Sequence, residues 1–255
     1  MEGMSFEAFV SKDDLEARSP SRSHGIDARL EATFRWSYCD FLRDAGIELR
    51  MPQLTIATAT VFCHRFYSQH SHAPAENSIF TIATACLFLA GKVEETPKSL
   101  REVVRVSYLV QHKNEYDFAV KRIHQQDCFE DQKQRLLNAE RLLLHALRFD
   151  FNVDHPYKHI LSLAKRAFED VHVTQNFSRN LTQVAWNFAN DSLRTTLCLQ
   201  FNARSIAAAV LYLASKLSRA MEDAPKDTWD SFGVAKKHCN EISNQIMDLY
   251  EEGDL

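Results

Sequence analysis

Apolar residues recur along most of the 255-residue chain at the three- and four-residue spacing that places them on one face of a helix. The first such pattern covers residues 29–46, and we expect Gly46 to end this helix as its C-cap. Its apolar stripe consists of Leu30, Phe34, Tyr38, Phe41 and Leu42. Pro52 suits a first helical position, so a second helix is predicted from there to about His70.

Three further helices are predicted in the first part of the chain. The apolar run IATACLFLAGKV at residues 82–93 predicts a buried helix that Pro97 limits. A shorter amphipathic helix is expected over residues 99–110, and a long one over about 127–149 after a polar stretch. Together with the first two, these patterns predict a bundle of five helices.

The N-terminal segment differs in composition from the rest of the chain. Residues 1–27 include SPSRSHG, a polar and turn-forming stretch, and are expected to form a leader with one short helix over residues 11–17. Ordered packing is therefore predicted to begin near Arg29.

The buried run is repeated. IATACLFLAGKV at residues 82–93 recurs 124 positions later as IAAAVLYLASKL at residues 206–217, with seven of twelve residues identical. This period exceeds that of solenoid repeats, so each copy is expected to be a whole bundle around its own central helix. The predicted fold is all-α, with two five-helix bundles over residues 28–152 and 153–255 and Asp154 as an N-cap at the start of the second.

Composition and charge exclude several classes of protein. Only six Gly and six Pro occur, which favours helices over turn-rich sheets, and the formal charge of −4 disfavours direct nucleic-acid binding. The six cysteines form no CxxC pair, so we expect neither a zinc site nor disulfides. We also expect the protein to reside in a reducing compartment. The longest apolar run, residues 80–91, is shorter than the roughly 20 residues of a membrane span, and the acidic N-terminus does not resemble a signal peptide.

Glu140 breaks the packing pattern of the long helix. It lies four residues from Leu136 and four from Leu144, which places a carboxylate on the apolar stripe. Because a lone buried carboxylate is costly, Glu140 is expected to lie at the edge of the stripe, to pair with a Lys or Arg of this chain, or to meet a partner protein.

Lys92 is the complementary exception. It continues the apolar face of Phe88, and Lys216 does the same in the repeated run. Either residue is explained by a lysine that extends its ammonium from a helix end into water. Lys92 and Glu140 are also able to pair with each other and to offer their remaining hydrogen bonds outward.

Other polar clusters point to no catalytic centre. His64, His70 and His72 lack accompanying ligands at metal-binding spacing and are expected to be surface and loop residues. Asn190 and Asp191 weakly resemble a magnesium site, but a capping or turn role is favoured. The sequence has no Gly-rich phosphate loop, GxSxG or HExxH motif, so no enzyme, cofactor or metal is predicted.

Several motifs, taken in order, resemble those of transcriptional cyclins. They are SPSR in the leader, HRFY at residues 64–67, LFLAGKVEETPK at 87–98, LRFDFNVDHPY at 147–157 and WNFANDSLRTTLCLQF at 186–201. The similarity is greatest to plant-type T cyclins, with K and L cyclins as near relatives, and covers about residues 15–251. It implies the tandem cyclin-box fold, in agreement with the two bundles inferred from the repeat.

The resemblance implies a regulatory subunit that binds a cyclin-dependent kinase of the ninth type in a positive elongation factor. That complex phosphorylates the tail of RNA polymerase II, which implies a nuclear location. The family's contacts with the mobile C-helix of the kinase carry over to Lys92 and Glu140 here. The apolar contacts around them correspond to Val93, Leu144, Phe149 and Phe151.

Three alternatives remain open. The first is a K-, L- or C-type cyclin that acts with another transcriptional kinase. The second is a promoter-binding general transcription factor of the same fold, although that role requires a basic face. The third is a helical enzyme that depends on magnesium. The first helix, FRWSYCDFL, lacks the MRAIL-like patch of cell-cycle cyclins, which favours a role in transcription.

Overall fold

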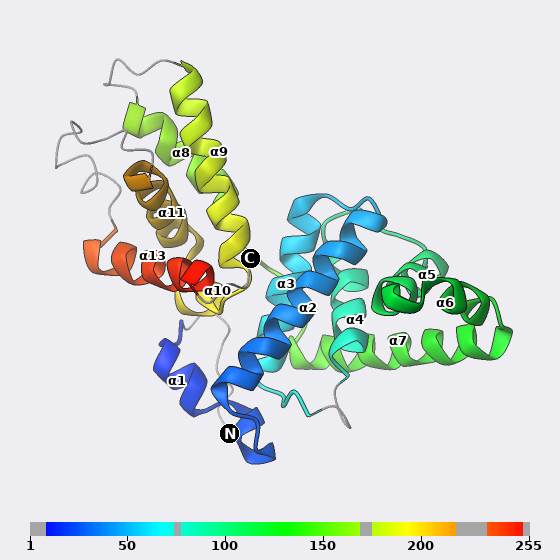
Figure 1. Ribbon diagram of the computed structural model, residues 1–255. Coiled ribbons are helices and arrows are strands. Elements are labelled where there is room, and N and C mark those ends of the chain that lie inside the picture. The colour runs from blue at the N-terminus through cyan, green and yellow to red at the C-terminus, as the bar shows by residue number, and fades with distance from the viewer. Residues whose placement is uncertain (1–8, 74–77, 169–174, 218–233, 252–255) are drawn as a thin grey trace. The chain divides into compact units, whose positions relative to one another are not determined.

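The computed structural model describes residues 9–73, 78–168, 175–217 and 234–251, and all the regular secondary structure in these ranges is helical (Figure 1). The chain divides into two compact units, Met1–Val153 and Asp154–Leu255. The predicted all-α class is confirmed.

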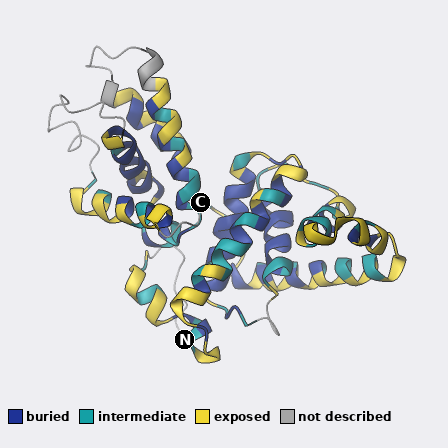
Figure 2. Cartoon of the chain, in the orientation of Figure 1, coloured by how far each residue is buried: buried dark blue, intermediate teal, exposed yellow. Residues whose placement is uncertain are grey.

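The first unit is built around one buried helix. Its elements are α1 (Lys12–Ala17), the 3-10 helix η1 (Pro20–His24), α2 (Ala28–Glu48), α3 (Gln53–Tyr67), α4 (Ile79–Val93), α5 (Leu100–Gln111), the 3-10 helix η2 (Lys113–Glu115), α6 (Tyr116–Ile123) and α7 (Gln126–Ala146). Helix α4 packs against α2, α3, α5 and α7. Every residue from 82 to 91 is buried, which explains the continuous apolar run (Figure 2).

Helix α6 was not predicted from the sequence, which indicated a polar connection between α5 and α7. Only Ala119 and Ile123 are buried in α6, whereas Tyr116 and Phe118 are 54% and 59% exposed. Two large side chains thus face outward, while Ala119 and Ile123 face inward. This arrangement hides the helical pattern from an analysis of hydrophobic periodicity.

Gly46 does not cap α2, contrary to the prediction. It is buried inside the helix, and a Cβ atom at this position would lie 2.5 Å from Cγ1 of Ile56 on α3. Glycine is therefore needed for the close approach of α2 and α3. The helix ends two residues later, and the N–H of Met51 donates to the Gly46 carbonyl oxygen at 2.9 Å, with Arg50 in the left-handed conformation (φ 52°).

Packing begins before Arg29, earlier than predicted. In the SPSR segment, Ser19 and Ser21 are buried. The Ser19 hydroxyl donates to Oε1 of Glu31 at 2.9 Å, and Arg22 binds the other oxygen of this carboxylate at 2.9 Å. The buried Glu31 on α2 is thereby paired on both sides, and the N-terminal segment is fastened to the first bundle.

The histidines also differ from expectation, because His64 and His72 are buried rather than exposed. Nδ1 of His64 shares a hydrogen bond of 2.6 Å with the Tyr38 hydroxyl, and Nδ1 of His72 shares one of 3.0 Å with the Ser21 hydroxyl. The His72 ring also stacks on Tyr67, with ring centroids 4.0 Å apart. Both imidazoles thus belong to polar networks of the core.

The second unit repeats the central arrangement. Its described helices are α8 (Pro156–Phe168), α9 (Gln175–Ser192), α10 (Leu197–Gln200), α11 (Ala203–Leu217) and α13 (Lys236–Glu251). Helix α11 is buried against α8, α9 and α13, and its bounds fall 124 positions after those of α4. The two copies of the repeated run therefore form equivalent central helices. Part of the predicted second bundle, residues 218–233, lies outside the described ranges.

The start of the second unit differs in detail from the predicted cap. Asp154 lies two residues before the first residue of α8, and its carboxylate binds Nζ of Lys158 at 2.7 Å and Nε2 of His159 at 2.8 Å. Burial opposes ionisation of Asp154, but these two hydrogen bonds outweigh it and lower the pKa of the carboxyl group.

Candidate functional site

Lys92 and Glu140 meet where the end of α4 crosses α7. Nζ of Lys92 lies 2.7 Å from Oε1 of Glu140 and 4.0 Å from the centre of the Phe88 ring. The side chain of Lys92 is 46% exposed and that of Glu140 is 13% exposed. The two residues therefore form an ion pair at the rim of the core, with an aromatic face beneath the ammonium.

This geometry leaves the pair able to bind a partner. The bond to Glu140 uses one of the three N–H donors of the Lys92 ammonium, and nearly half of the lysine side chain remains in water. A partner that covers the site would strengthen the Lys92–Glu140 hydrogen bond by excluding that water. The site is thus charged in the free protein without the full desolvation penalty of a buried pair.

The end of α4 is held by a helix-terminating turn in the KVEET motif. The N–H of Thr96 donates to the Gly91 carbonyl oxygen at 2.8 Å, and Glu95 adopts the left-handed conformation (φ 55°). The carboxylate of Glu94 accepts a hydrogen bond of 2.7 Å from the hydroxyl of Thr58 on α3. The two glutamates therefore fix the position of the α4 terminus, next to Lys92.

Two aromatic side chains follow the end of α7. Arg148 and Phe149 both have positive φ values, 52° and 59°, and the Phe149 N–H donates to the Leu144 carbonyl oxygen at 3.1 Å. Phe149 is 61% exposed, and its ring centre lies 6.1 Å from that of Phe151. Phe151 in turn makes an edge contact with Phe62 in the core.

Arg65 was missed as part of this surface by sequence reasoning. Its guanidinium donates to the carbonyl oxygens of Asp150 at 3.3 Å and Asn152 at 2.9 Å, and so holds the segment that comes after α7. Arg65 is the arginine of the HRFY motif, so the signal was present as part of the resemblance without an assigned role.

The predicted site residues thus lie at the end of α4, in the last two turns of α7 and in the segment that follows α7. Lys92 and Glu140 are in direct contact. Val93, Leu144 and Phe151 are partly buried against the hydrophobic core, whereas Phe149 is exposed. Leu142 of α7 is also 39% exposed and was not predicted as a site residue.

The other polar candidates serve the packing of the second unit. The hydroxyl of Tyr157 donates to Oδ1 of Asn190 at 2.9 Å, and that of Tyr250 donates to Oδ2 of Asp191 at 2.6 Å. Burial raises the pKa of Asp191. Within the described ranges, no three His, Cys, Asp or Glu side chains are grouped as metal ligands, and no helix is long and apolar enough to cross a membrane.

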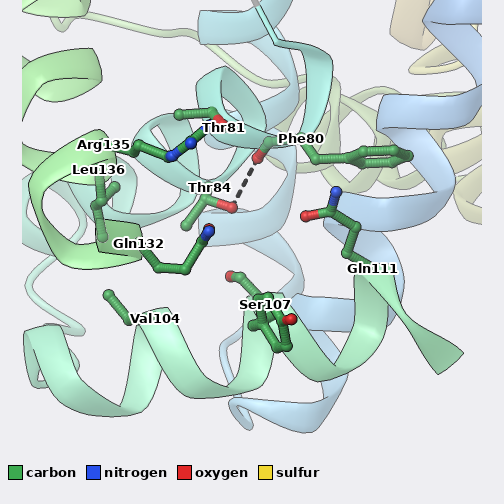
Figure 3. A pocket seen from close by; sticks show the side chains of 10 residues that line it. Phe80, Thr81, Thr84, Val104, Ser107, Gln111, Gln132, Arg135 and Leu136 are labelled. Carbon is green, nitrogen blue, oxygen red and sulfur yellow. Dashed lines mark hydrogen bonds between the residues drawn. The ribbon is translucent and has the colours of Figure 1, made fainter. Parts of the chain in front are cut away.

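A small cavity lies between α4, α5 and α7 of the first unit (Figure 3). Thr84, Ser107 and Gln132 line it with Arg135, and the Thr84 hydroxyl donates to the carbonyl oxygen of Phe80 on its own helix at 2.7 Å. The volume of about 20 Å³ suffices for a water-sized molecule only. This cavity is too small to bind a metabolite.

Comparison with known proteins identifies the class of fold. The family described as "Cyclin, N-terminal domain" matches residues 7–152. A chain of the yeast RNA Pol II CTD kinase CTDK-1 complex is similar over 95% of this chain and 72% of its own length, with a TM-score of 0.73 and 23% sequence identity. A viral cyclin from herpesvirus saimiri is similar over 87% and 86%, with a TM-score of 0.63 and 12% identity. The fold is that of a cyclin.

Similar curated plant proteins indicate the subfamily of cyclins. Cyclin-T1-3 of Oryza sativa subsp. japonica is 47% identical over 96% of this chain and 48% of its own length, and cyclin-T1-4 of Arabidopsis thaliana is 46% identical over 96% and 44%. The chain thus spans about half the length of these relatives. Putative cyclin-T1-1 of Arabidopsis thaliana is 40% identical over 95% of this chain and 93% of its own length. The chain belongs to the cyclin family, among its plant T-type members. Members of this family are regulatory subunits rather than enzymes, as the sequence predicted.

Proposed function

We propose that this protein is the regulatory subunit of a transcriptional cyclin-dependent kinase of the ninth type. The observation that supports this most directly is the half-exposed ion pair of Lys92 and Glu140, with the exposed ring of Phe149 just beyond the end of the helix that carries Glu140. Interface cores are usually apolar, so a charged pair among apolar side chains favours a partner whose own polar groups pair with both charges.

The proposed mechanism is a shift in the conformation of the kinase. The C-helix of the kinase would place its polar groups against Lys92 and Glu140, and its apolar groups against Val93, Leu144, Phe149 and Phe151. The cyclin activates the kinase only if this surface binds the active position of the C-helix more tightly than the inactive one. The fixed helix ends of α4 and α7 suit this role because a rigid surface loses little entropy on binding.

We further propose that the complex phosphorylates the tail of RNA polymerase II, and that it does so in the nucleus. The T-type relatives support a role in transcription, and a similar solved structure is described as an RNA Pol II CTD kinase complex. The formal charge of −4 gives no support to the alternative of a promoter-binding factor.

The test is reconstitution with purified kinases. The chain is mixed in turn with kinases of the ninth type and with those that K-, L- and C-type cyclins activate, and phosphate transfer to a polymerase-tail peptide is measured. We expect no transfer by the chain alone and activation of the ninth-type kinase. Activation of another transcriptional kinase instead would assign the protein to that kinase, and activation of none would refute the proposal.

A further inference from the structure

A second surface of the first unit has the features of a binding groove. Helices α5 and α6 both pack on α7 (Figure 1), and a hollow of about 400 Å³ opens between the start of α5, the end of α6 and the start of α7. The residues that line it are Leu100, Arg101, Arg105, Ile123, His124, Gln126, Phe129 and Lys133. No carboxylate lines this hollow, although the whole chain is acidic.

Cationic side chains from two helices meet in this groove. Arg101 and Arg105 are four residues apart and therefore lie on one face of α5. Nη2 of Arg105 lies 3.3 Å from Nε2 of His124, which orients its guanidinium. Lys133 contributes an ammonium from α7, and Glu130 binds it at 2.9 Å. Even with Glu130 included, the groove has an excess of positive charge.

The base of the groove is apolar. Ile123 is buried, and Leu100 and Phe129 are partly buried against the core of the unit. An apolar side chain that entered between them would displace water from hydrophobic surface. The combination selects for a ligand with an anionic group next to an apolar one.

We propose that this groove binds a phosphorylated segment of a protein, with the phosphate held by Arg101 and Arg105 and a neighbouring apolar side chain on Phe129. A phosphoserine carries nearly two negative charges and three acceptor oxygens, which match two guanidinium groups better than a single carboxylate does. Lys133 adds a third cation near the phosphate. The assignment rests on this charge complementarity and on the pairing of cations with an apolar base.

This surface is separate from the ion pair of Lys92 and Glu140. Lys133 precedes Glu140 by seven residues on α7, which is two turns or about 10 Å along the helix axis. The proposed ligand is a phosphorylated segment rather than the kinase, and its binding is measured on the chain without the kinase. In a cyclin that supports repeated phosphorylation, such a groove would retain a substrate that is already phosphorylated.

The test uses the full chain and a fluorescein-labelled peptide that has one phosphoserine beside a leucine, followed by fluorescence anisotropy. The comparison peptides have serine or glutamate in place of the phosphoserine. We expect the phosphopeptide to bind at least tenfold more tightly than either, and its affinity to fall as salt is raised. The Arg101→Glu and Arg105→Glu variants should each weaken binding at least tenfold. The Arg29→Glu variant makes the same charge change on exposed surface of α2 and should alter binding less than twofold.

Three results would overturn the proposal. Equal affinity for the glutamate peptide would show a site for acidic segments without selection for phosphate. Equal weakening by Arg29→Glu would show attraction by the overall charge rather than by the groove. If the chain does not bind the phosphopeptide although its melting curve shows that it is folded, the groove is not a phosphopeptide site.

Discussion

The lysines of the two central helices of this cyclin have different surroundings in the described part of the chain, although the helix sequences match. Lys92 of α4 and Lys216 of α11 occupy the same position in the repeat, and each lies over the aromatic ring four residues earlier, at 4.0 Å from Phe88 and 4.4 Å from Tyr212. In the first unit, α7 adds the carboxylate of Glu140 at 2.7 Å. In the described part of the second unit, the ammonium of Lys216 contacts the ring of Tyr212.

The comparison separates a packing role of the lysine from a binding role. A lysine that covers an aromatic ring at a helix end is explained by its aliphatic stem and by the cation–π contact, and this suffices for Lys216. The addition of Glu140, itself only 13% exposed, turns the end of α4 into an ordered charged centre. We therefore assign the proposed kinase contact to the first unit.

The largest expected effect comes from breaking that ion pair. Glu140→Ala and Lys92→Ala should each weaken binding of the kinase about 30-fold or more, equivalent to about 2 kcal/mol, because a charge at the centre of the covered interface loses its partner. The free protein should keep most of its stability, because water reaches Lys92 in Glu140→Ala and the rim position of Glu140 lets water hydrate its carboxylate in Lys92→Ala. A binding titration and a thermal melt on the same samples measure both quantities.

Lys216→Ala is the matched control in the second unit. It removes the same side chain from the equivalent helix end and should change kinase binding less than twofold. If it weakens binding as much as Lys92→Ala does, the two helix ends are functionally equivalent and the assignment to the first unit is wrong. If Glu140→Ala lowers the melting temperature strongly and leaves binding intact, the pair is purely structural.

A second prediction uses the buried histidine that fastens the N-terminal segment to the first unit. Burial, with help from the charge of Arg35, lowers the pKa of His72 from 6.5 to about 3. Between these values the unfolded chain binds a proton that the folded chain does not, so stability is present above pH 6.5 and is lost as the pH falls. The loss is about 1.4 kcal/mol per pH unit, or about 2 kcal/mol between pH 6.5 and pH 5.

Urea unfolding at pH 7 and pH 5 measures this loss, and His72→Gln is the control because an amide can still meet the Ser21 hydroxyl but does not titrate. The variant should lose about 2 kcal/mol less than the parent over this range. Amide hydrogen exchange should show the acid effect in α2 and α3 rather than in α11. Equal pH dependence of parent and variant would contradict the assignment to His72.

A third prediction exchanges the residues that differ beside the two lysines. Gly91 of α4 corresponds to Ser215 of α11. A Cβ atom at Gly91 would lie 3.0 Å from Cε of Met51 and 3.3 Å from the Thr96 carbonyl oxygen. The methionine side chain is flexible and can move away, whereas the backbone of the turn at Thr96 is held in place. Gly91→Ser should destabilise the protein by about 1 to 2 kcal/mol through crowding.

The reverse exchange, Ser215→Gly in α11, should lower stability for a different reason. The Ser215 hydroxyl donates to the Tyr212 carbonyl oxygen at 2.7 Å within α11, and Ser215→Gly should cost about 1 kcal/mol because glycine is a poor helix former. Chemical denaturation of both variants measures these values. If Gly91→Ser leaves the free energy of unfolding unchanged, the α4 terminus tolerates the residue that α11 has at this position. The contrast between the two units would then be weaker.

The sequence predicted the central helices well because they are buried on all sides. Their apolar runs, their repetition and their lysines were all visible, and the bounds of α4 and α11 agree with the repeat. Helix α6 escaped detection because its exposed face carries Tyr116 and Phe118. Gly46 was misassigned because periodicity does not distinguish a glycine that caps a helix from one that allows two helices to approach.

For the candidate site, the stripe pattern identified Lys92 and Glu140 as exceptions but left their pairing open, because contact between residues 48 positions apart depends on how α4 and α7 cross. Arg65 and Glu94 belong to the HRFY and KVEE motifs, but their roles depend on tertiary contacts that these motifs do not reveal. The helix ends were the least predictable feature, since Arg50, Glu95 and Arg148 occupy the left-handed position where glycine is usual.

The smallest expected effect tests the turn that ends α4. Glu95 has φ 55°, which strains a residue with a Cβ atom, and Glu95→Gly should stabilise the protein by about 0.5 to 1 kcal/mol if the turn is retained. Because the Thr96–Gly91 hydrogen bond positions the backbone beside Lys92 without using the Glu95 side chain, kinase binding should stay within twofold of the parent. Arg50→Gly, which relieves the same strain at the end of α2, is the control for stability. A gain in stability with a large loss of binding would show instead that the Glu95 carboxylate contacts the kinase, and the proposed surface would then extend from the ion pair across the turn.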